Sequence, residues 1–376
     1  MRIRLALLMG LLLFVGPANA AGPTSLAQGK AGLWPHAIES RTAFDAASRA
    51  ELLVSATVLD TLIQHNPNAD ALGIRRLHEA SVEQWLEATR RQWLDGFRQA
   101  STSCSSQDRS CGFSGASWDE LVAFGQSYAE TAATHPDYAA WLTHSQAFYT
   151  AYFREQWRLA ALFPSPSSEI LRFDDGEWLG DELDDGQFLL SFDDGPTTAG
   201  GHTDRYIALL NEHKVPALFF VLGESLQRRK QATSPAALAS LYEHHCLASH
   251  GMAHNAHPRW TDWQASIDDT RRLILQLFPE QETVAFRPPY GQRNAAIASH
   301  VHATADPLVL WNIDSQDWNR RIGSESMLER IKKLMLVRRQ GIILFHDTQA
   351  KALSVLPDLI EFAYAAELEW RDCDRF

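Results

Sequence analysis

The sequence lacks the features of several protein classes. It contains no long run of lysine and arginine, and its 34 basic residues are outnumbered by 46 acidic ones, a formal net charge of −12. This balance argues against a nucleic-acid-binding protein, because such a protein needs a basic surface to displace counterions from phosphates. Repeats and low-complexity segments are absent as well. With 45% hydrophobic residues, the composition is that of a folded globular protein, not of a disordered or collagen-like one.

Cysteine is scarce, with only Cys104, Cys111, Cys246 and Cys373 in 376 residues. They form no Cys-x-x-Cys or Cys/His zinc-finger spacing, so the pattern gives no indication of a structural zinc site. Cys104 and Cys111 flank a polar loop, which favours a local disulfide. For Cys246 and Cys373 two interpretations stay open, a disulfide that ties down the C-terminal region or two buried free thiols.

Long hydrophobic runs are also missing, except for one at the N-terminus. There, Arg2 and Arg4 precede the apolar residues 5–15, and the small-x-small triplet Ala18-Asn19-Ala20 follows. This pattern is typical of a signal peptide cleaved after Ala20, and the run is shorter than the about 20 residues of a transmembrane helix. We therefore expect residues 21–376 to be exported, to the periplasm or the medium, with no transmembrane segment after cleavage. The alternative is an uncleaved N-terminal anchor.

The first half of the chain has the pattern of helices. Long stretches lack glycine and proline, and apolar residues recur at steps of three and four, which predicts helices over 41–65 and 74–100. A capping-box pattern at Ser117-Trp118-Asp119-Glu120 and a proline at 136 predict two more, the last through residue 162. Trp141, Phe148 and Tyr152 share one face of that last helix, which indicates packing, with a sugar-stacking surface as the alternative. We expect a helical N-terminal domain over 21–165.

A proline- and serine-rich segment, 163–168, separates this region from one with a different pattern. Short β-rich segments then alternate with helical ones, which is typical of an α/β fold with a parallel sheet or barrel over 166–376. A helix is expected over 204–213. Strands are expected over 188–192, 217–222, 246–249, 284–286, 308–313 and 342–345.

Polar clusters follow several of these strands. Asp193 and Asp194 come directly after the apolar strand 188–192, where one carboxylate can bind a metal and the other can accept a proton from water. The same Asp-Asp-Gly tripeptide begins at 174 and at 184. Neither of those copies follows a comparably apolar strand, so we interpret both as turns.

The next cluster contains His250 and His254, four residues apart after the strand 246–249. Two imidazoles at this spacing can face one cation, although His257 competes with His254 for the role. A carboxylate and two imidazoles form a set of three ligands that leaves coordination positions open for water, as catalysis requires.

Three further clusters follow the later strands. Arg287 precedes two prolines and Tyr290, and the fixed backbone can aim its guanidinium at a carboxylate. Asp314, Asp317 and Trp318 follow the strand 308–313. Leu344 and His346 end the strand 342–345.

In this order the five clusters resemble the motifs of the polysaccharide deacetylases, carbohydrate esterase family 4, also called the NodB-homology domain. The resemblance covers about residues 187–365 and includes the apolar segment 215–223. It implies a distorted (β/α) barrel with fewer than eight regular repeats. It also implies metal-dependent removal of acetyl groups from glycans, so the expected partner is an acetylated glycan.

The resemblance implies a role for each matching residue. Asp194, His250 and His254 would bind the divalent metal, with zinc expected and cobalt, nickel or iron also compatible. Asp193 would be the general base, kept ionised and oriented by Arg287.

Further roles concern the oxyanion, the leaving group and the acetyl methyl group. The backbone N–H of Tyr290 would stabilise the oxyanion. His346 would protonate the leaving amine, supported by Asp317 or, as the less favoured choice, Asp314. Trp318 and Leu344 would line the pocket for the methyl group.

Two positions depart from the family pattern. Ser191 stands in place of threonine, which keeps the hydroxyl. Gly251 stands in place of serine or threonine, which removes a hydroxyl from the metal-binding loop.

The sequence favours an N-deacetylase acting on peptidoglycan, a chitin-type oligomer or an exopolysaccharide. The alternatives are an O-acetyl esterase, a hydrolase of non-sugar amides on the same site, and a glycan-binding protein with a vestigial site. The helical region is expected to be a packing cap or a platform for the polymer, or else a partner-binding surface. The sequence carries no signal for an oligomeric state.

Overall fold

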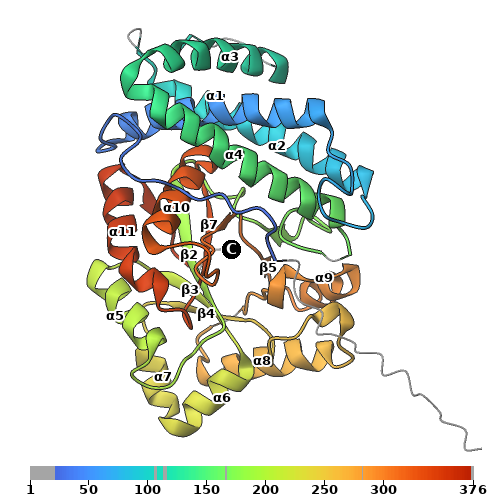
Figure 1. The fold of residues 1–376 in the computed structure, drawn as a ribbon. Coiled ribbons are helices and arrows are strands. Elements are labelled where there is room, and N and C mark those ends of the chain that lie inside the picture. Colours follow the sequence, from blue (N-terminus) through green and yellow to red (C-terminus); the bar gives the residue numbers. More distant parts are fainter. Residues whose placement is uncertain (1–21, 106–107, 113–116, 166, 282, 374–376) are drawn as a thin grey trace, which may run out of the picture.

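The computed structural model describes residues 22–105, 108–112, 117–165, 167–281 and 283–373. A layer of helices lies against a second part of the molecule that combines strands and helices, as Figure 1 shows. The signal peptide expected over residues 1–20 lies outside the described residues. Four long helices form the helical layer: α1 (Arg41–His65), α2 (Glu79–Ala100), α3 (Trp118–Thr134) and α4 (Pro136–Leu162).

Side chains that cap the first turns fix where these helices begin. Ser40 accepts a hydrogen bond from the backbone N–H of Ala43, and Ser117 accepts one from Glu120 at 3.3 Å, as the capping-box pattern predicts. The expectation that the second helix starts at residue 74 was wrong. His78 has an extended backbone, and its Nδ1 accepts from the N–H of Ser81, so α2 starts at Glu79.

The aromatic face of α4 packs inward, as predicted. Trp141 and Phe148 are 1% and 2% exposed and belong to the hydrophobic core. Tyr152, one turn after Phe148, is also buried, but it lies at the edge of that core and lines a cavity described below.

Within the described residues, six parallel strands form the main sheet, and five of them lie side by side in one row. The central strand β2 (Gln187–Asp193) lies between β3 (Ala217–Val221) and β7 (Gly341–His346), with β4 (Cys246–Ser249) beside β3 and β6 (Ile313–Asp314) beside β7. In the register of the sheet, Asp193 is opposite Phe220 on one side and His346 on the other. Because all strands are parallel, their C-terminal ends meet at one edge of the sheet.

The sheet closes into a distorted barrel through irregular segments. The strand expected over 284–286 is reduced to Phe286, which bridges to Ser249 on one side and Leu308 on the other. The strand expected over 308–313 is two short strands, because the chain bends between β5 (Leu308–Val309) and β6. The first half pairs with Phe286 and with β1 (Glu177–Trp178), and the second half pairs with β7. The expected fold class, a distorted (β/α) barrel preceded by helices, is confirmed.

The remaining elements surround the barrel. A two-residue strand, β8 (Glu369–Trp370), pairs with the start of β2. The helix expected over 204–213 is α5. The helices of this part are α5 (His202–His213), α6 (Gly223–Ala232), α7 (Pro235–Leu241), α8 (Trp263–Leu277), α9 (Ala295–His302), α10 (Ser324–Arg338) and α11 (Leu356–Ala365).

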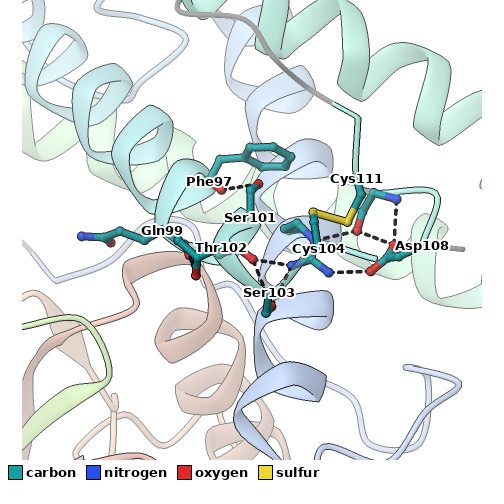
Figure 2. Close-up of a disulfide and its surroundings, with 11 residues drawn as sticks. Phe97, Gln99, Ser101, Thr102, Ser103, Cys104, Asp108 and Cys111 are labelled. Atoms are coloured by element: carbon teal, nitrogen blue, oxygen red, sulfur yellow. Dashed lines mark hydrogen bonds and ion pairs between the residues drawn. A yellow bond between two sulfur atoms is a disulfide. The ribbon is translucent and has the colours of Figure 1, made fainter. Parts of the chain in front are cut away.

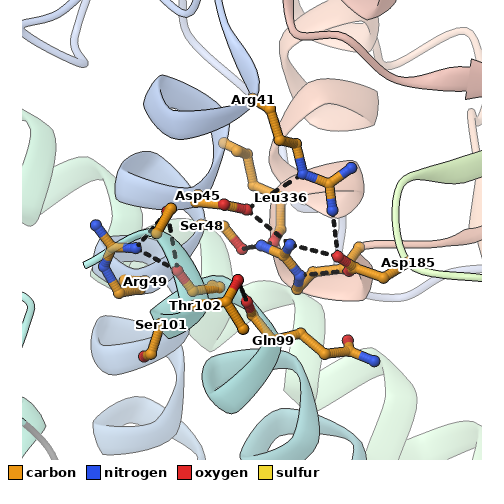
Figure 3. A network of polar contacts seen from close by, with 12 residues as sticks. Arg41, Asp45, Ser48, Arg49, Gln99, Ser101, Thr102, Asp185 and Leu336 are labelled. Carbon is orange, nitrogen blue, oxygen red and sulfur yellow. Dashed lines mark hydrogen bonds and ion pairs between the residues drawn. The ribbon is translucent and has the colours of Figure 1, made fainter.

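The helical layer is joined to the barrel by buried polar contacts as well as by a shared hydrophobic core. Arg339, fully buried after α10, donates to Asp45 and Ser48 of α1 and to both carboxylate oxygens of Asp185. Arg41 also pairs with Asp185, as Figure 3 shows. One core cluster contains residues of α1 and α4 together with residues of β2, α10 and α11. The division into domains over 21–165 and 166–376 stays a prediction.

All four cysteines are paired. Cys104 and Cys111 form the local disulfide that the sequence favours, and Figure 2 shows it beside Asp108, whose carboxylate accepts from the N–H of Ser110 and pairs with Arg49. Cys246 at the start of β4 is bonded to Cys373 near the C-terminus, which decides between the two open interpretations. None of the described helices is both long and apolar enough to span a membrane.

Candidate active site

The barrel brings the strand-end clusters together at one edge. Asp193 ends β2, His346 ends β7, and His250 directly follows β4. These residues, together with Asp194 and His254, line one cavity of about 430 Å³. Residues of all five strand-end clusters therefore lie around one cavity, as the sequence predicts.

Asp194, His250 and His254 form a cluster with the geometry of a cation site. Their ligand atoms lie within 4.8 Å of one another, with Asp194 Oδ1 at 3.6 Å from His250 Nε2 and 3.4 Å from His254 Nε2. This Oδ1 is buried and has no hydrogen-bond partner among the described residues. A buried, unpartnered carboxylate oxygen facing two imidazole nitrogens is unfavourable without a cation, so the donor set fits a divalent metal.

The surroundings orient the two histidines. His250 Nδ1 donates to the carbonyl oxygen of Arg287 at 2.7 Å, which leaves Nε2 free to bind a cation. The ring of His254 packs edge-on against Tyr290, with the ring centroids 4.4 Å apart. Burial, followed by the neighbouring His254, holds the pKa of His250 well below its ordinary value, so His250 is neutral, as a ligand must be.

His257, the competing ligand, lies outside this cluster. It is fully buried, with Nδ1 at 2.9 Å from the carbonyl oxygen of Asn255 and Nε2 at 3.1 Å from Ser266 Oγ. It supports the loop instead. A larger residue would not fit at Gly251, because its Cβ would lie 2.8 Å from the His257 ring and from Ser266 Oγ. The backbone of Gly251 is also left-handed, with φ +77°, a conformation that favours glycine. The Ser266 hydroxyl also accepts from the N–H of Met252 at 2.7 Å, so His257 and Ser266 brace the loop where the family pattern has a hydroxyl at 251.

Asp193 is buried beside Arg287. Arg287 Nη1 donates to Asp193 Oδ1 at 2.8 Å and to Ser191 Oγ at 2.9 Å, so the hydroxyl retained at 191 helps to position the guanidinium. Backbone carbonyls of Val309 and Leu310 accept from its other nitrogens. Burial raises the pKa of Asp193 to about 6, although Arg287 acts to lower it. Arg287 therefore only partly offsets the cost of burying this charge, and the carboxylate titrates close to neutrality.

His346 is held by Asp317. His346 Nδ1 lies 2.8 Å from Asp317 Oδ1, and the backbone N–H of His346 donates to Asp317 Oδ2 at 2.7 Å. Burial alone lowers the pKa of His346, but the charge of Asp317 and its hydrogen bond raise it to about 10. Asp314, the less favoured alternative, instead accepts from the backbone N–H of Gln316, and among the described residues no hydrogen bond joins it to His346.

The residues expected at the substrate line the same cavity. Leu344 is buried on β7, whereas Tyr290 and Trp318 are each 40% exposed and so lie at the rim. Tyr290 has a left-handed backbone, φ 61°, within the turn that follows Arg287 and the two prolines. The structure brings all the expected site residues together, while their chemical roles stay predictions.

Asp347 is a site residue to which sequence reasoning assigned no role. It is 1% exposed beneath the Asp193-Asp194-Gly195 turn, accepts from Thr203 Oγ1 at 2.8 Å, and its backbone N–H donates to the carbonyl of Asp193. A Cβ carbon on Gly195 would lie 2.0 Å from Asp347 Oδ2, which explains glycine in this turn. Burial raises the pKa of Asp347 to about 8. Its position directly after His346 was the one sequence feature that could have indicated that Asp347 lies near the site.

The cavity also has a wall that sequence reasoning missed. Residues 22–29, here called the N-terminal strap, cross between the helical layer and the barrel, where Figure 1 shows a dark blue segment. Glu155 of α4 accepts from the backbone N–H groups of Thr24 and Ser25, and Arg330 of α10 donates to the carbonyl of Ala27. Residues 22, 23 and 25–27 line the same cavity as Asp193, Asp194, His250 and His254. No sequence pattern before residue 41 pointed to this wall.

Comparisons with known proteins give a consistent result. The family model for polysaccharide deacetylases matches residues 180–305. A chitooligosaccharide deacetylase of Rhizobium leguminosarum bv. phaseoli is 32% identical over 174 residues, which are 44% of this chain and 72% of the relative. The peptidoglycan-N-acetylglucosamine deacetylase PgdA of Listeria monocytogenes is 29% identical over 43% of this chain and 32% of its own length.

Solved structures are similar to part of this chain at lower sequence identity. The Bc1960 peptidoglycan N-acetylglucosamine deacetylase covers 53% of this chain and 91% of its own, at 19% identity and a TM-score of 0.46. A family 4 carbohydrate esterase of Streptomyces lividans covers 48% of this chain and 90% of its own, at 24% identity and a TM-score of 0.41.

Proposed function

Because the chain belongs to the polysaccharide deacetylase family, we propose that it is an exported, metal-dependent enzyme that hydrolyses N-acetyl groups of a glycan to amine and acetate. One observation carries this proposal. A three-ligand cation site, a buried carboxylate that titrates near neutrality, and a histidine paired with a carboxylate all line one cavity. Amide hydrolysis requires charge stabilisation, a base and an acid, which the cation site, the buried carboxylate and the histidine can supply in that order.

The cation site supplies charge stabilisation. A divalent ion held by Asp194, His250 and His254 would act as a Lewis acid toward water and the acetyl carbonyl. One carboxylate and two imidazoles suit zinc and are compatible with cobalt, nickel and iron. We propose zinc.

Asp193 serves as the general base. Arg287 occupies Oδ1 of Asp193, which leaves Oδ2, on the side of His250, to accept the proton of the attacking water. A pKa of about 6 makes Asp193 mostly ionised at pH 7 and yet basic enough to accept a proton. Ser191 and the carbonyl groups around Arg287 keep the pair in place.

His346 serves as the general acid. Asp317 binds Nδ1 and stabilises the protonated ring, so Nε2 carries the proton that the leaving amine needs. Tyr290 supplies a backbone N–H for the oxyanion, and removal of one such donor typically costs about 3–4 kcal/mol of transition-state stabilisation. Trp318 and Leu344 contact the acetyl methyl group.

Export is supported by two independent features. The first 20 residues have the pattern of a cleaved signal peptide, and both disulfides are of the kind that persists in oxidising compartments. Expression with the native leader should give a periplasmic or secreted protein whose N-terminal residue is Ala21. A mature protein that still begins with Met1 would contradict the proposed cleavage of a signal peptide.

The activity is tested by acetate release from purified residues 21–376. N-Acetylglucosamine oligomers, peptidoglycan and O-acetylated xylan are each assayed with chelator and with added zinc. Chelator-sensitive acetate from an N-acetylated glycan is expected. Acetate from xylan alone would replace the proposal with an O-acetyl esterase, and no acetate from any substrate with the metal bound would overturn it.

A further inference from the structure

A second cavity adjoins the catalytic one. It has a volume of about 520 Å³ and lies between the helical layer and the barrel, with α2 on one side and residues 311, 312 and 314 of the barrel on the other. Each cavity falls in the size range of ligand sites in proteins. The two cavities share Tyr152, Gln156, Glu169, Trp311, Asp314 and Arg330.

Because these six residues line both cavities, the two lie side by side, and these residues form their common junction. On the catalytic side, the N-terminal strap and α4 form a wall that Glu155 and Arg330 fasten through the strap backbone. Gly29 is packed so closely that a Cβ there would lie 2.4 Å from the backbone of α10. The strap is thus a built part of the cleft.

The second cavity has the chemistry of a glycan-binding cleft. Its exposed lining is polar, with side chains of α2 such as Gln84 and Arg91 at the rim, whereas Trp85 and Trp311 are 3% and 7% exposed and present only a small part of their rings to it. Sugars present hydroxyl groups that pair with amides, carboxylates and guanidinium groups, and C–H faces that pack on aromatic rings.

The junction carries two acidic side chains. Glu169 is half-buried there, and burial, followed by the charge of Asp314, raises its pKa to about 7. A carboxyl group that titrates near neutrality can donate to or accept from a sugar hydroxyl. The amide of Gln156, on the α4 side, adds both a donor and an acceptor.

We propose that this second cavity binds the sugar units next to the one being deacetylated, so that the substrate is an extended oligo- or polysaccharide lying between the helical layer and the barrel. The inference rests on the proposed function and specifies its substrate class. It gives the helical region a direct part in substrate binding, through Gln84, Ala88 and Arg91 of α2 and Tyr152 and Gln156 of α4.

The test is the chain-length dependence of deacetylation by zinc-loaded residues 21–376. N-Acetylglucosamine oligomers from the dimer to the hexamer are compared by kcat/KM for acetate release. We expect kcat/KM to rise at least about tenfold from the shortest to the longest oligomer, through a lower KM, because added sugars gain contacts away from the reacting bond.

Two variants locate the effect. Ala88→Trp places a large side chain in the second cavity from an exposed position on α2, and Gln156→Ala removes the amide at the junction. Each should lower the hexamer-to-dimer ratio of kcat/KM several-fold, mainly through KM for the hexamer. The matched controls are Ala133→Trp, exposed on α3, and Gln146→Ala, exposed on α4, which should keep the wild-type ratio.

Failures of the two proposals give different results. Active enzyme with equal kcat/KM for all lengths, or a ratio that Ala88→Trp leaves at the wild-type value, would overturn the second cavity as a substrate site while the deacetylase stands. Absence of acetate from every oligomer with zinc bound would instead overturn the function itself. Thermal melting of each variant shows that a changed ratio comes from a folded protein.

Discussion

Two copies of the tripeptide Asp-Asp-Gly lie at opposite ends of the same strand and do different work. Asp184-Asp185-Gly186 precedes β2, where Asp185 pairs with Arg41 and Arg339 and joins the helical layer to the barrel. Asp193-Asp194-Gly195 follows at the other end, where the carboxylates meet two histidines and a buried arginine. The direction of the strand decides the difference, because only its C-terminal end opens into the catalytic cavity.

The comparison shows how the neighbours of a carboxylate decide whether its oxygens are satisfied or stay available. Asp185 is met by two guanidinium groups, so both of its oxygens are satisfied and it serves as a structural link. Asp193 has one guanidinium on Oδ1, and Asp194 Oδ1 has no hydrogen-bond partner among the described residues. Unmet carboxylate oxygens in a buried cavity are available for a proton or a cation.

The largest effect is expected from Asp193→Asn. The amide cannot accept the proton of the attacking water, so turnover should fall by about 10²–10⁴-fold while the metal stays bound. Acetate release and the zinc content of the same preparation measure both quantities. Full activity in Asp193→Asn beside a folded but inactive Asp174→Asn would reverse the assignment of the two turns.

His250→Ala should also remove activity, but through loss of the metal. It deletes one of three ligands and the one whose Nδ1 is held by Arg287, so zinc content should drop below stoichiometric after dialysis. The control is His257→Gln, which keeps a hydrogen-bonding side chain next to Ser266 in the brace of the loop and should retain zinc. Loss of zinc in His257→Gln but not in His250→Ala would show that His257, and not His250, is the ligand.

The third effect is a pH dependence that only the catalytic turn should show. Burial raises the pKa of Asp193 to about 6, and a protonated base is inactive, so kcat/KM should fall about tenfold per pH unit below the pKa. A bound cation favours the ionised carboxylate, so the limb lies at or below pH 6. Zinc content followed over the same pH range separates this limb from metal loss, and a flat profile down to pH 4 with zinc retained would contradict it.

Asp185→Asn should change stability and leave the chemistry intact. It removes the negative charge shared by Arg41 and the buried Arg339, at an expected cost of about 1–3 kcal/mol in the free energy of unfolding. Urea unfolding measures this cost, and kcat at a temperature where the variant is folded should match the wild type. A lowered kcat with unchanged stability would place Asp185 in the catalytic machinery.

The smallest effect is expected from Asp184→Asn and Asp174→Asn. Both side chains are exposed in turns, and surface substitutions of this kind usually change stability by less than about 0.5 kcal/mol. Neither should alter zinc content or kcat, and because Asp174 lines the second cavity, only Asp184→Asn is also expected to keep the wild-type KM for long oligomers. These variants share the tripeptide chemistry of Asp193→Asn, and so they are its matched controls.

The sequence was sufficient to predict the barrel, and which residues meet at its strand ends, for a local reason. Each of the five clusters directly follows a short apolar segment, and parallel strands bring their ends together whatever the intervening helices do. Asp317 was favoured over Asp314 only through the family resemblance, and the contact itself needed coordinates, because residues three positions apart after a bent strand point in different directions.

Other features depend on contacts far apart in the sequence. The N-terminal strap reaches the catalytic cavity through Glu155 and Arg330, which are more than 100 residues away along the chain. The role of Asp347 follows from its burial beneath Gly195, and the pairing of Cys246 with Cys373 spans 127 residues. Neither periodicity nor motif spacing carries such information.

The most direct test of the account is a crystal structure of the zinc-loaded protein with the ion located by its anomalous scattering. The account predicts one strong peak bonded to Asp194, His250 Nε2 and His254 Nε2 at about 2.0–2.2 Å, with Asp193 beside it and still paired with Arg287. A peak at His257, at Asp185 or at Asp174, with the Asp194 cluster free of zinc, would contradict it.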